Sequence, residues 1–363
     1  TKNSEGTIRG GAKGCCRYGS SSFLLGCTLS YNERYDLLYR ICIGAAGRIS
    51  VEKEELYLVK KSQTDAQNGT VIFKAFTNNS GSGDITVEYN NGKRGKNPEC
   101  KAIRSMSVLS QMQSRLPSDI EKYAQTIKTI QYVQTTLSNM FVLEPIPSLM
   151  RGYSRIGDSV LRRNCSNISA VLASIQENSP DDWQKFCDII ESLPENEIQG
   201  ISFVKTTIND VILIQKEQNG KSTENIDATR LSDGTLRCIA VLAAVISEPE
   251  HSLIAIEELD NGIHPSRIIK LIKSLCEIAQ RRKIDLVLTP HNVTVLNGLS
   301  KEDVLGVSVV YRDKETQASR IVPFVEIENQ AGILASGGIG TAMESERLLD
   351  EIKNEKEIVP FDF

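Results

Sequence analysis

The stretch Leu253-Ile254-Ala255-Ile256-Glu257-Glu258 decides the fold. Four consecutive apolar residues are typical of a strand that is covered on both faces in a parallel sheet. Two adjacent carboxylates end the run, and open α/β sheets bind ligands at the carboxyl ends of their strands. One carboxylate can hold Mg²⁺, usually through water, while its neighbour orients or deprotonates an attacking water. The simpler alternative for this stretch alone is a loop that begins in solvent.

A small-residue cluster precedes this strand, and a histidine cluster follows it. Leu231-Ser232-Asp233-Gly234-Thr235 stands directly before an apolar helix expected over 234–247. A hydroxyl and free backbone N–H groups at a helix start can receive an anion, although an ordinary N-cap is the alternative. A second buried strand, expected over 284–289, is followed by Pro290-His291-Asn292. A histidine there can reach a γ-phosphate or be purely structural.

Composition excludes several classes of protein. The chain has 363 residues, of which 40% are hydrophobic and 24% charged, so it can bury a sizeable core. No apolar run approaches the roughly 20 residues of a membrane span, and we expect no membrane partner. The net charge of −4 argues against a generally basic nucleic-acid coat. Nine scattered cysteines without a CxxC pair, and three histidines, argue against a zinc site or a disulfide framework and favour the cytoplasm.

The rest of the chain changes character twice. Alternation with period two over 21–90 predicts an antiparallel meander, and the pattern changes to helical over 117–143, where Ser118 and Glu121 suggest a capping box. From 200 onward, strands and helices mix. The other elements expected are helices over 156–176, 181–193, 265–282 and near 343–354, and strands over 200–204, 211–215 and 304–311.

The three clusters together resemble a known family. Residues 231–235 are similar to the ABC-type signature, 254–265 (IAIEELDNGIHP) to a Walker B strand with its D-loop, and His291 to the switch histidine. The combination is most similar to the RecF/SMC-like ATPases of the ABC superfamily, with weaker similarity at 8–11, 149–151 and 167–172. This resemblance implies an α/β fold: an ABC-type ATPase head with an antiparallel β subdomain, a mostly parallel P-loop NTPase core and a helical insertion.

The resemblance also implies a role for each matching residue. Glu257 would stand at the position associated with Mg²⁺, Glu258 would be the general base, and His291 would sense the γ-phosphate of ATP. Ser232 and Gly234 would contact ATP held by another copy, and the D-loop would communicate across the dimer. The full set implied to bind nucleotide is Leu231, Ser232, Asp233, Gly234, Thr235, Asp260, Asn261 and Gly262.

The sequence departs from the family pattern in three places. Glu257 stands where Asp is commonest, and Pro290 precedes the histidine where Thr or Ser is usual. No GxxxxGK[ST] phosphate loop occurs, and the spacing of the glycines in 10–14 is wrong for one. Because the chain starts at Thr1, we expect the phosphate loop upstream. Gln111 and Gln113 are weak candidates for the Q-loop glutamine.

Two classes of function stay open. The first is an ATP hydrolase that closes as a head-to-tail homodimer, or a larger homo-oligomer, around two nucleotides. The second is a nucleotide-gated scaffold with little turnover that restrains a separate nuclease or toxin, as such ATPases do in prokaryotic anti-phage defence. A RecF-like DNA-repair ATPase is a further alternative, with the basic stretches 92–96 and 151–163 as its DNA contacts or as solvated faces.

We expect four segments along the chain. Residues 1–110 would be the β-rich part of the nucleotide-binding lobe, and 111–200 a helical insertion. Residues 201–330 would be the α/β lobe that carries the signature, Walker B, D-loop and switch histidine. Residues 331–363 would be a C-terminal tail.

Overall fold

The computed structural model describes residues 10–61, 69–77, 81–116, 121–194, 198–313, 317–345, 348 and 352. The chain forms two compact units, residues 1–138 and 139–363. This division coincides with neither of the boundaries expected at 110 and 200. The functional names given to the four segments stay predictions.

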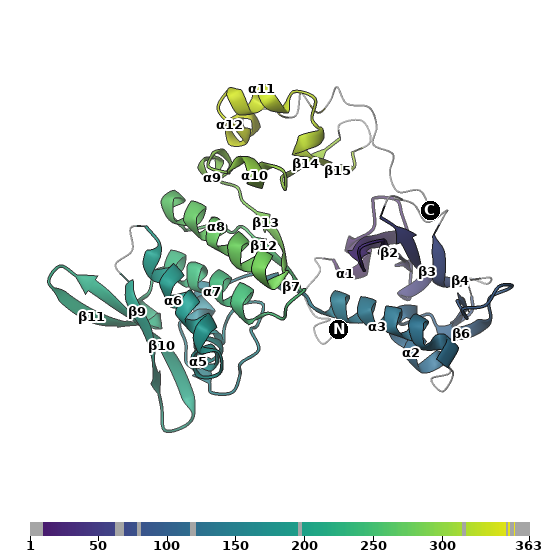
Figure 1. Cartoon of the computed structure of the whole chain (residues 1–363), viewed down its shortest axis with the longest axis horizontal. Helices are drawn as coiled ribbons and strands as arrows, with labels where there is room; N and C mark the ends of the chain where they lie inside the picture. Colours follow the sequence, from purple (N-terminus) through teal and green to yellow (C-terminus); the bar gives the residue numbers. More distant parts are fainter. Residues whose placement is uncertain are drawn as a thin grey trace. The chain divides into compact units, whose positions relative to one another are not determined.

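The first unit is built on a six-stranded antiparallel sheet whose strands follow one another in chain order (Figure 1). The strands are β1 (Ser22–Ser30), β2 (Tyr35–Gly44), β3 (Ser50–Lys60), β4 (Thr70–Phe76), β5 (Asp84–Tyr89) and β6 (Glu99–Ile103). The meander predicted over 21–90 is therefore confirmed, and β6 extends it by one strand. The four-residue helix α1 (Gly11–Gly14) precedes the sheet.

Helices cover one face of this sheet. They are α2 (Val108–Arg115), the 3-10 turn η1 (Glu121–Tyr123) and α3 (Ala124–Ser138). Their apolar stripe, which includes Met112, Ile130 and Val133, packs in one cluster with Leu56 and Phe73 of the sheet. The helix expected over 117–143 was wrong at its end, because 140–143 form a strand of the second unit. The capping box at Ser118 lies outside the described residues.

A buried carboxylate joins the sheet to α2. Glu54 of β3 is 0% exposed. It accepts hydrogen bonds from Val108 N at 2.6 Å, Leu109 N at 2.8 Å, Ser107 Oγ at 2.8 Å and Tyr39 Oη at 3.0 Å. The carboxylate thereby satisfies the first two free N–H groups of α2, those of Val108 and Leu109, and serves as a helix cap supplied from a distant strand.

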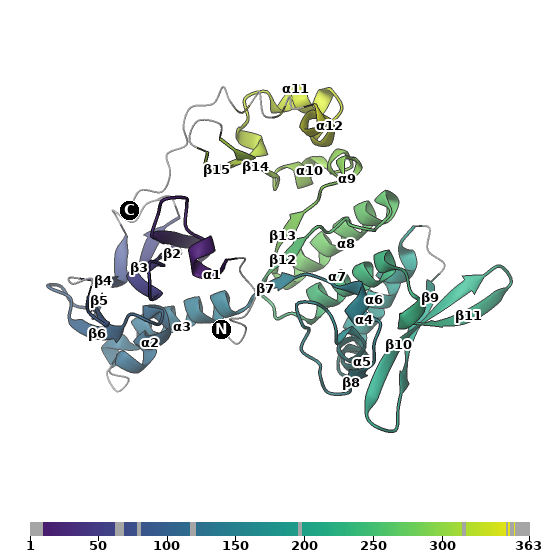
Figure 2. The same cartoon turned by 180° about the vertical axis from the view of Figure 1, so that it is seen from behind.

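The second unit contains a three-stranded parallel sheet in the order β13-β12-β7 (Figure 2). Its strands are β7 (Met140–Leu143), β12 (Leu253–Glu257) and β13 (Asp285–Thr289). Ile254 and Ile256 point into the main core of the unit. On the other face, Val142 is 39% and Val287 48% exposed. The expectation that both faces are covered is therefore wrong for the described residues.

Two helices form the core beside this sheet. In α7 (Asp233–Ser247) every residue from Gly234 to Ile246 except Arg237 is buried, as expected for a helix that is apolar on all sides. Helix α8 (Pro265–Arg282) begins with Pro265 in its first turn, and its C-cap residue Lys283 has a left-handed φ of 55°. The predicted bounds of α8 and β12 are confirmed.

An antiparallel sheet and three helices complete this core. The strands are β8 (Ser154–Arg155), β9 (Ile198–Lys205), β10 (Asp210–Asn219) and β11 (Ser222–Asp227), and the helices are α4 (Pro147–Met150), α5 (Ile168–Asn178) and α6 (Pro180–Ser192). The strands expected at 200–204 and 211–215 are thus confirmed, as an antiparallel hairpin. A single-turn helix, η2 (Ala228–Arg230), leads from β11 towards α7.

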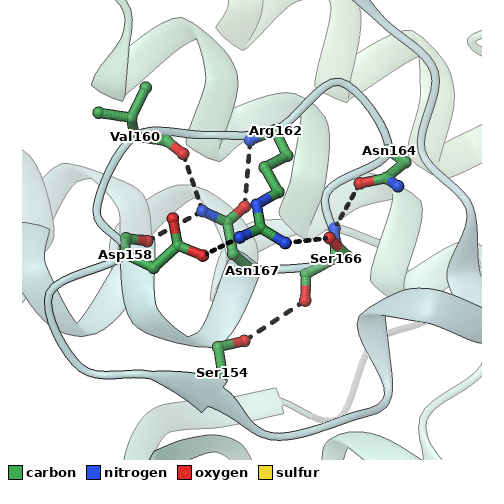
Figure 3. Close-up of polar contacts among 7 residues, drawn as sticks. All are labelled: Ser154, Asp158, Val160, Arg162, Asn164, Ser166 and Asn167. Carbon is green, nitrogen blue, oxygen red and sulfur yellow. Dashed lines mark hydrogen bonds and ion pairs between the residues drawn. The ribbon is translucent and has the colours of Figure 1, made fainter. Parts of the chain in front are cut away.

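The helix expected over 156–176 begins only at Ile168. Before it, the loop is organised by Asn167, which is 1% exposed (Figure 3). Its amide donates to Asp158 O at 2.9 Å and Val160 O at 2.8 Å and accepts from Arg162 N at 3.1 Å. One buried side chain replaces the backbone hydrogen bonds that a helix would have made, which is why the apolar pattern misled the prediction.

The C-terminal part of the unit is made of short elements. They are α9 (Val293–Asn297), α10 (Lys301–Val304), β14 (Ser308–Arg312), β15 (Ser319–Pro323), η3 (Phe324–Glu326), α11 (Gln330–Ala335) and α12 (Ile339–Glu344). The strand expected over 304–311 therefore starts four residues late. Asn297 accepts from Gly340 N at 2.8 Å, and so ties α12 to α9.

Candidate active site

The two strand-end clusters meet at one edge of the parallel sheet. Glu257 is the register partner of Thr289 at the ends of β12 and β13. Glu258 follows with a left-handed φ of 50°, and its N–H donates to Thr289 Oγ1 at 3.1 Å. This turn leaves both carboxylates exposed at the end of the strand. The hydroxyl of Thr289 thus fixes the backbone of the candidate general base, a contact that the sequence analysis missed.

A pocket of about 440 Å³ opens at this edge. Its lining comes from the loops after β12 and β13: Glu258, Asp260, Asn261, Gly262, His291 and Asn292. Asn261 Nδ2 donates to Glu258 Oε2 at 3.2 Å. The structure therefore gathers the predicted base, the predicted D-loop and the predicted switch histidine around one cavity. The sequence analysis assigned no role to Asn292, which also lines the pocket.

Asp260 holds the two loops together. It is 9% exposed, and its carboxylate accepts from His291 N at 3.0 and 3.2 Å and from Asn292 N at 2.5 Å. Asn292 in turn caps α9, because its Oδ1 accepts from Thr294 N at 2.8 Å. The Asp260 carboxylate thus bonds within its own chain.

The predicted signature cluster, residues 231–235, lies at the start of α7. Ser232 Oγ accepts from Thr235 N at 3.1 Å and lies 2.8 Å from Thr235 Oγ1, which is N-cap geometry. Arg151 Nη2 donates to Leu231 O at 2.8 Å and to Asp233 Oδ1 at 2.6 Å. Only the similarity at 149–151 pointed to Arg151, and it gave the residue no role.

The start of α7 lies against the predicted D-loop, at Gly262. A Cβ added at Gly234 would stand 2.3 Å from Gly262 O, closer than any real contact. Glycine at 234 is therefore needed for close approach of two backbone segments. None of residues 231–235 is among the described residues that line the pocket.

Few of the described side chains near the pocket could bind a metal ion or act as a nucleophile. Within the described ranges, no group of three or more His, Cys, Asp or Glu side chains could hold a metal ion. Mg²⁺ at Glu257 would therefore take its other oxygen ligands from water and phosphate, as this ion commonly does. Burial raises the pKa of Cys238 on α7 to about 12, so this thiol is not a nucleophile at neutral pH.

The two candidates for the Q-loop glutamine lie on α2. Gln111 is buried, and its side-chain amide accepts from Ile103 N and donates to Ile103 O, both at 2.9 Å. Gln113 is exposed.

Comparison with known proteins identifies the region around this pocket. Residues 137–297 match a family model described as "AAA domain, putative AbiEii toxin, Type IV TA system". This segment, which is less than half of the chain, is therefore similar to that AAA family. The matched segment ends at Asn297 and includes β7, α7, β12 and His291. A search of curated proteins finds no match.

Several solved structures are similar to this chain, and one of them has low identity to it. It is the Smc head domain with an extended coiled coil bound to the C-terminal domain of ScpA, derived from Pyrococcus furiosus. The identity is 10%, the TM-score is 0.34, and the alignment covers 88% of this chain and 75% of that one. In the part of the chain that the structure describes, no helix is both long enough and apolar enough to span a membrane.

Proposed function

We propose that this chain hydrolyses ATP at a site completed by a second copy of the chain, arranged head to tail. The observation that carries the proposal is the pocket that gathers Glu258 and His291 from the ends of adjacent parallel strands. The family of residues 137–297 is an ATPase family, which supports this chemistry. Glu258 would take the proton of the attacking water, and His291 would contact the γ-phosphate.

Glu257 fits the role of the Mg²⁺ residue. It is exposed at the end of β12, beside Glu258, and its carboxylate has no hydrogen bond or ion pair among the described residues. When bound, Mg²⁺ would neutralise developing charge on the phosphates. The positions of the two carboxylates explain why Glu258 is proposed as the general base and Glu257 as the Mg²⁺ residue. Glu258 lines the pocket and is held by Asn261, whereas Glu257 is free to turn towards the ion.

The signature is proposed to act in the other copy. Ser232 is exposed at the start of α7, yet no described residue of 231–235 lines the chain's own pocket. Its hydroxyl and the first N–H groups of α7 would instead meet a γ-phosphate bound to the partner copy, where helix starts favour anions. Leu231, Asp233 and Thr235 would hold this turn in shape through the contacts with Arg151 and Ser232.

The nucleotide state is proposed to control a separate effector, a nuclease or toxin, in prokaryotic defence. The description of the matching family names a toxin and a toxin–antitoxin system, and this supports an effector of that kind. DNA as a partner stays a prediction. The loop at 92–96 that suggested it is exposed in the first unit.

The test uses the full-length protein with Glu258→Gln. Loss of the general base should lower the hydrolysis rate by ~10²–10⁴ while ATP-dependent dimerisation persists or strengthens. Hydrolysis at the parent rate would refute the assignment of Glu258. A parent protein that dimerises with ATP and turns over very slowly would favour the scaffold function instead.

A mixing experiment tests the composite site. Ser232→Arg should block ATP-driven dimerisation but leave nucleotide binding by the single copy intact. Ser232→Ala is the comparison variant, since it removes the hydroxyl and with it the cap, about 1 kcal/mol, but adds no bulk where the partner's nucleotide would approach. In a mixture of Ser232→Arg with Glu258→Gln, one mixed site combines an intact base with an intact signature. Partial recovery of hydrolysis supports the arrangement, and mixed dimers without recovery contradict it.

A further inference from the structure

We propose that Asp260 is a positioning residue that places His291 at the pocket from within its own chain. The proposal rests on the proposed function, in which His291 contacts the γ-phosphate. It gives Asp260 a role in the resting chain that is separate from any contact across a dimer.

The contacts of Asp260 define the loop after β13. Both carboxylate oxygens accept from His291 N, at 3.2 and 3.0 Å, and Oδ2 also accepts from Asn292 N at 2.5 Å. The preceding residue, Pro290, has no N–H and a fixed φ. The His291 N–H is therefore the first donor after β13, and Asp260 captures it together with the next one.

Burial makes these bonds strong and directional. Asp260 is 9% exposed, and no ion pair with a cation occurs among the described residues. A carboxylate in such a place needs charge-assisted hydrogen bonds to offset its lost hydration, and the two backbone N–H groups supply them. Moving the loop would break all of these bonds together, so the backbone at His291 has one favoured position.

A second tie makes the two loops a single unit. Glu258 N donates to Thr289 Oγ1 at 3.1 Å, directly before the Asp260 contacts in the chain. The loop after β12 is thus attached to the loop after β13 at two successive points. These two attachments hold the backbone of Glu258 and the backbone of His291 at a fixed distance and orientation. Catalysis would depend on this geometry.

The start of α9 does not depend on Asp260. Asn292 Oδ1 caps Thr294 N at 2.8 Å without it. Removing the carboxylate should therefore release the backbone at His291 without unfolding the helix that follows, so a rate effect can be separated from a loss of structure.

The experiment compares Asp260→Asn and Asp260→Ala in the full-length protein. Asp285→Asn is the matched control, because Asp285 is an exposed carboxylate at the opposite end of β13. Amide hydrogen exchange at His291 and Asn292 should be about tenfold faster in the Asn variant and faster still in the Ala variant. For hydrolysis, kcat should fall on the order of 10²-fold while KM for ATP changes by less than about threefold.

The outcomes separate this proposal from the proposed function. Unchanged exchange at both amides would overturn the positioning role, even if hydrolysis fell. Parent-like hydrolysis in both variants would also overturn it. If Asp260→Ala fails to fold, the isosteric Asn variant gives the same two readouts. The exchange measurement needs no turnover, whereas the proposed function fails on Glu258→Gln, so the two failures are distinguishable.

Discussion

Replacing Arg151 by alanine should loosen the signature turn without touching the pocket. Arg151 follows α4, and one nitrogen, Nη2, serves both Leu231 O at 2.8 Å and Asp233 Oδ1 at 2.6 Å. No other described side chain holds the carbonyl of Leu231. The guanidinium therefore fixes the two residues that flank Ser232, the side chain we propose to meet the partner's nucleotide.

The two contacts differ in expected strength. The ion pair is largely exposed, with 27% of the Arg151 side chain and 63% of the Asp233 side chain accessible, so it should contribute roughly 0.2–1 kcal/mol. The hydrogen bond from the charged guanidinium to Leu231 O should add about 1–2 kcal/mol. Arg151→Ala should therefore cost about 1–3 kcal/mol, and Asp233→Ala only the smaller part.

The single tryptophan offers a local measurement. Trp183 lies on α6 in the second unit, stacked on Phe186 with ring centroids 5.4 Å apart. Its fluorescence during urea unfolding reports on this unit separately from the first. ATP hydrolysis should fall by up to about tenfold in Arg151→Ala, since 1.4 kcal/mol of lost preorganisation corresponds to a factor of ten. If Arg151→Ala and Asp233→Ala lose the same free energy of unfolding within about 0.3 kcal/mol, the role given to the Leu231 contact is wrong.

Two further predictions concern buried polar side chains. Asn167→Ala should lower the free energy of unfolding of the second unit by about 2–4 kcal/mol, because three hydrogen bonds to the loop backbone are lost. Asn167→Asp keeps the shape but loses both donors, and a cost below 1 kcal/mol in either variant would contradict the role of this amide. In the first unit, burial raises the pKa of Glu54, against hydrogen bonds from Leu109, Val108, Ser107 and Tyr39 that lower it. The folded state therefore keeps its proton to higher pH, so stability falls as pH rises from about 4.3 through the raised pKa. Glu54→Gln should remove this dependence of the free energy of unfolding on pH, measured for the first unit by hydrogen exchange during urea unfolding. If the dependence stays unchanged in the variant, another titrating group causes it.

Local signals predicted the elements that carry the site. Helix α8 was found because Pro265 marks its first turn and its apolar stripe continues to Ile278. Strand β12 was found because an uninterrupted apolar run ends in charge. The roles of Glu258, Asp260 and His291 were implied by the family resemblance. The structure brings the three residues together because the carboxyl ends of parallel strands meet at one edge of the sheet.

The errors arose where distant residues decide the structure. The run 140–143 reads as the tail of a helix, but it pairs in parallel with β12, which is far along the chain. Apolar residues alone do not distinguish these alternatives. Likewise, the contacts of Arg151 with Leu231 and of Asp260 with the switch-loop backbone join residues that no local pattern relates. The sequence therefore predicted which residues gather, but not the hydrogen bonds that hold them.

The close approach of Gly234 to Gly262 determines how variants of the signature should be interpreted. Any side chain at 234 must displace the D-loop carbonyl, which a Cβ would approach to 2.3 Å. A bulkier residue there would disturb Asp260 and Asn261 in the same chain, and hydrolysis would fall whether or not the glycine ever meets a phosphate. A substitution at Gly234 therefore reports on packing within a single copy of the chain. Ser232 is exposed two residues before Gly234, and it is the position at which we expect a substitution to report on the neighbouring copy.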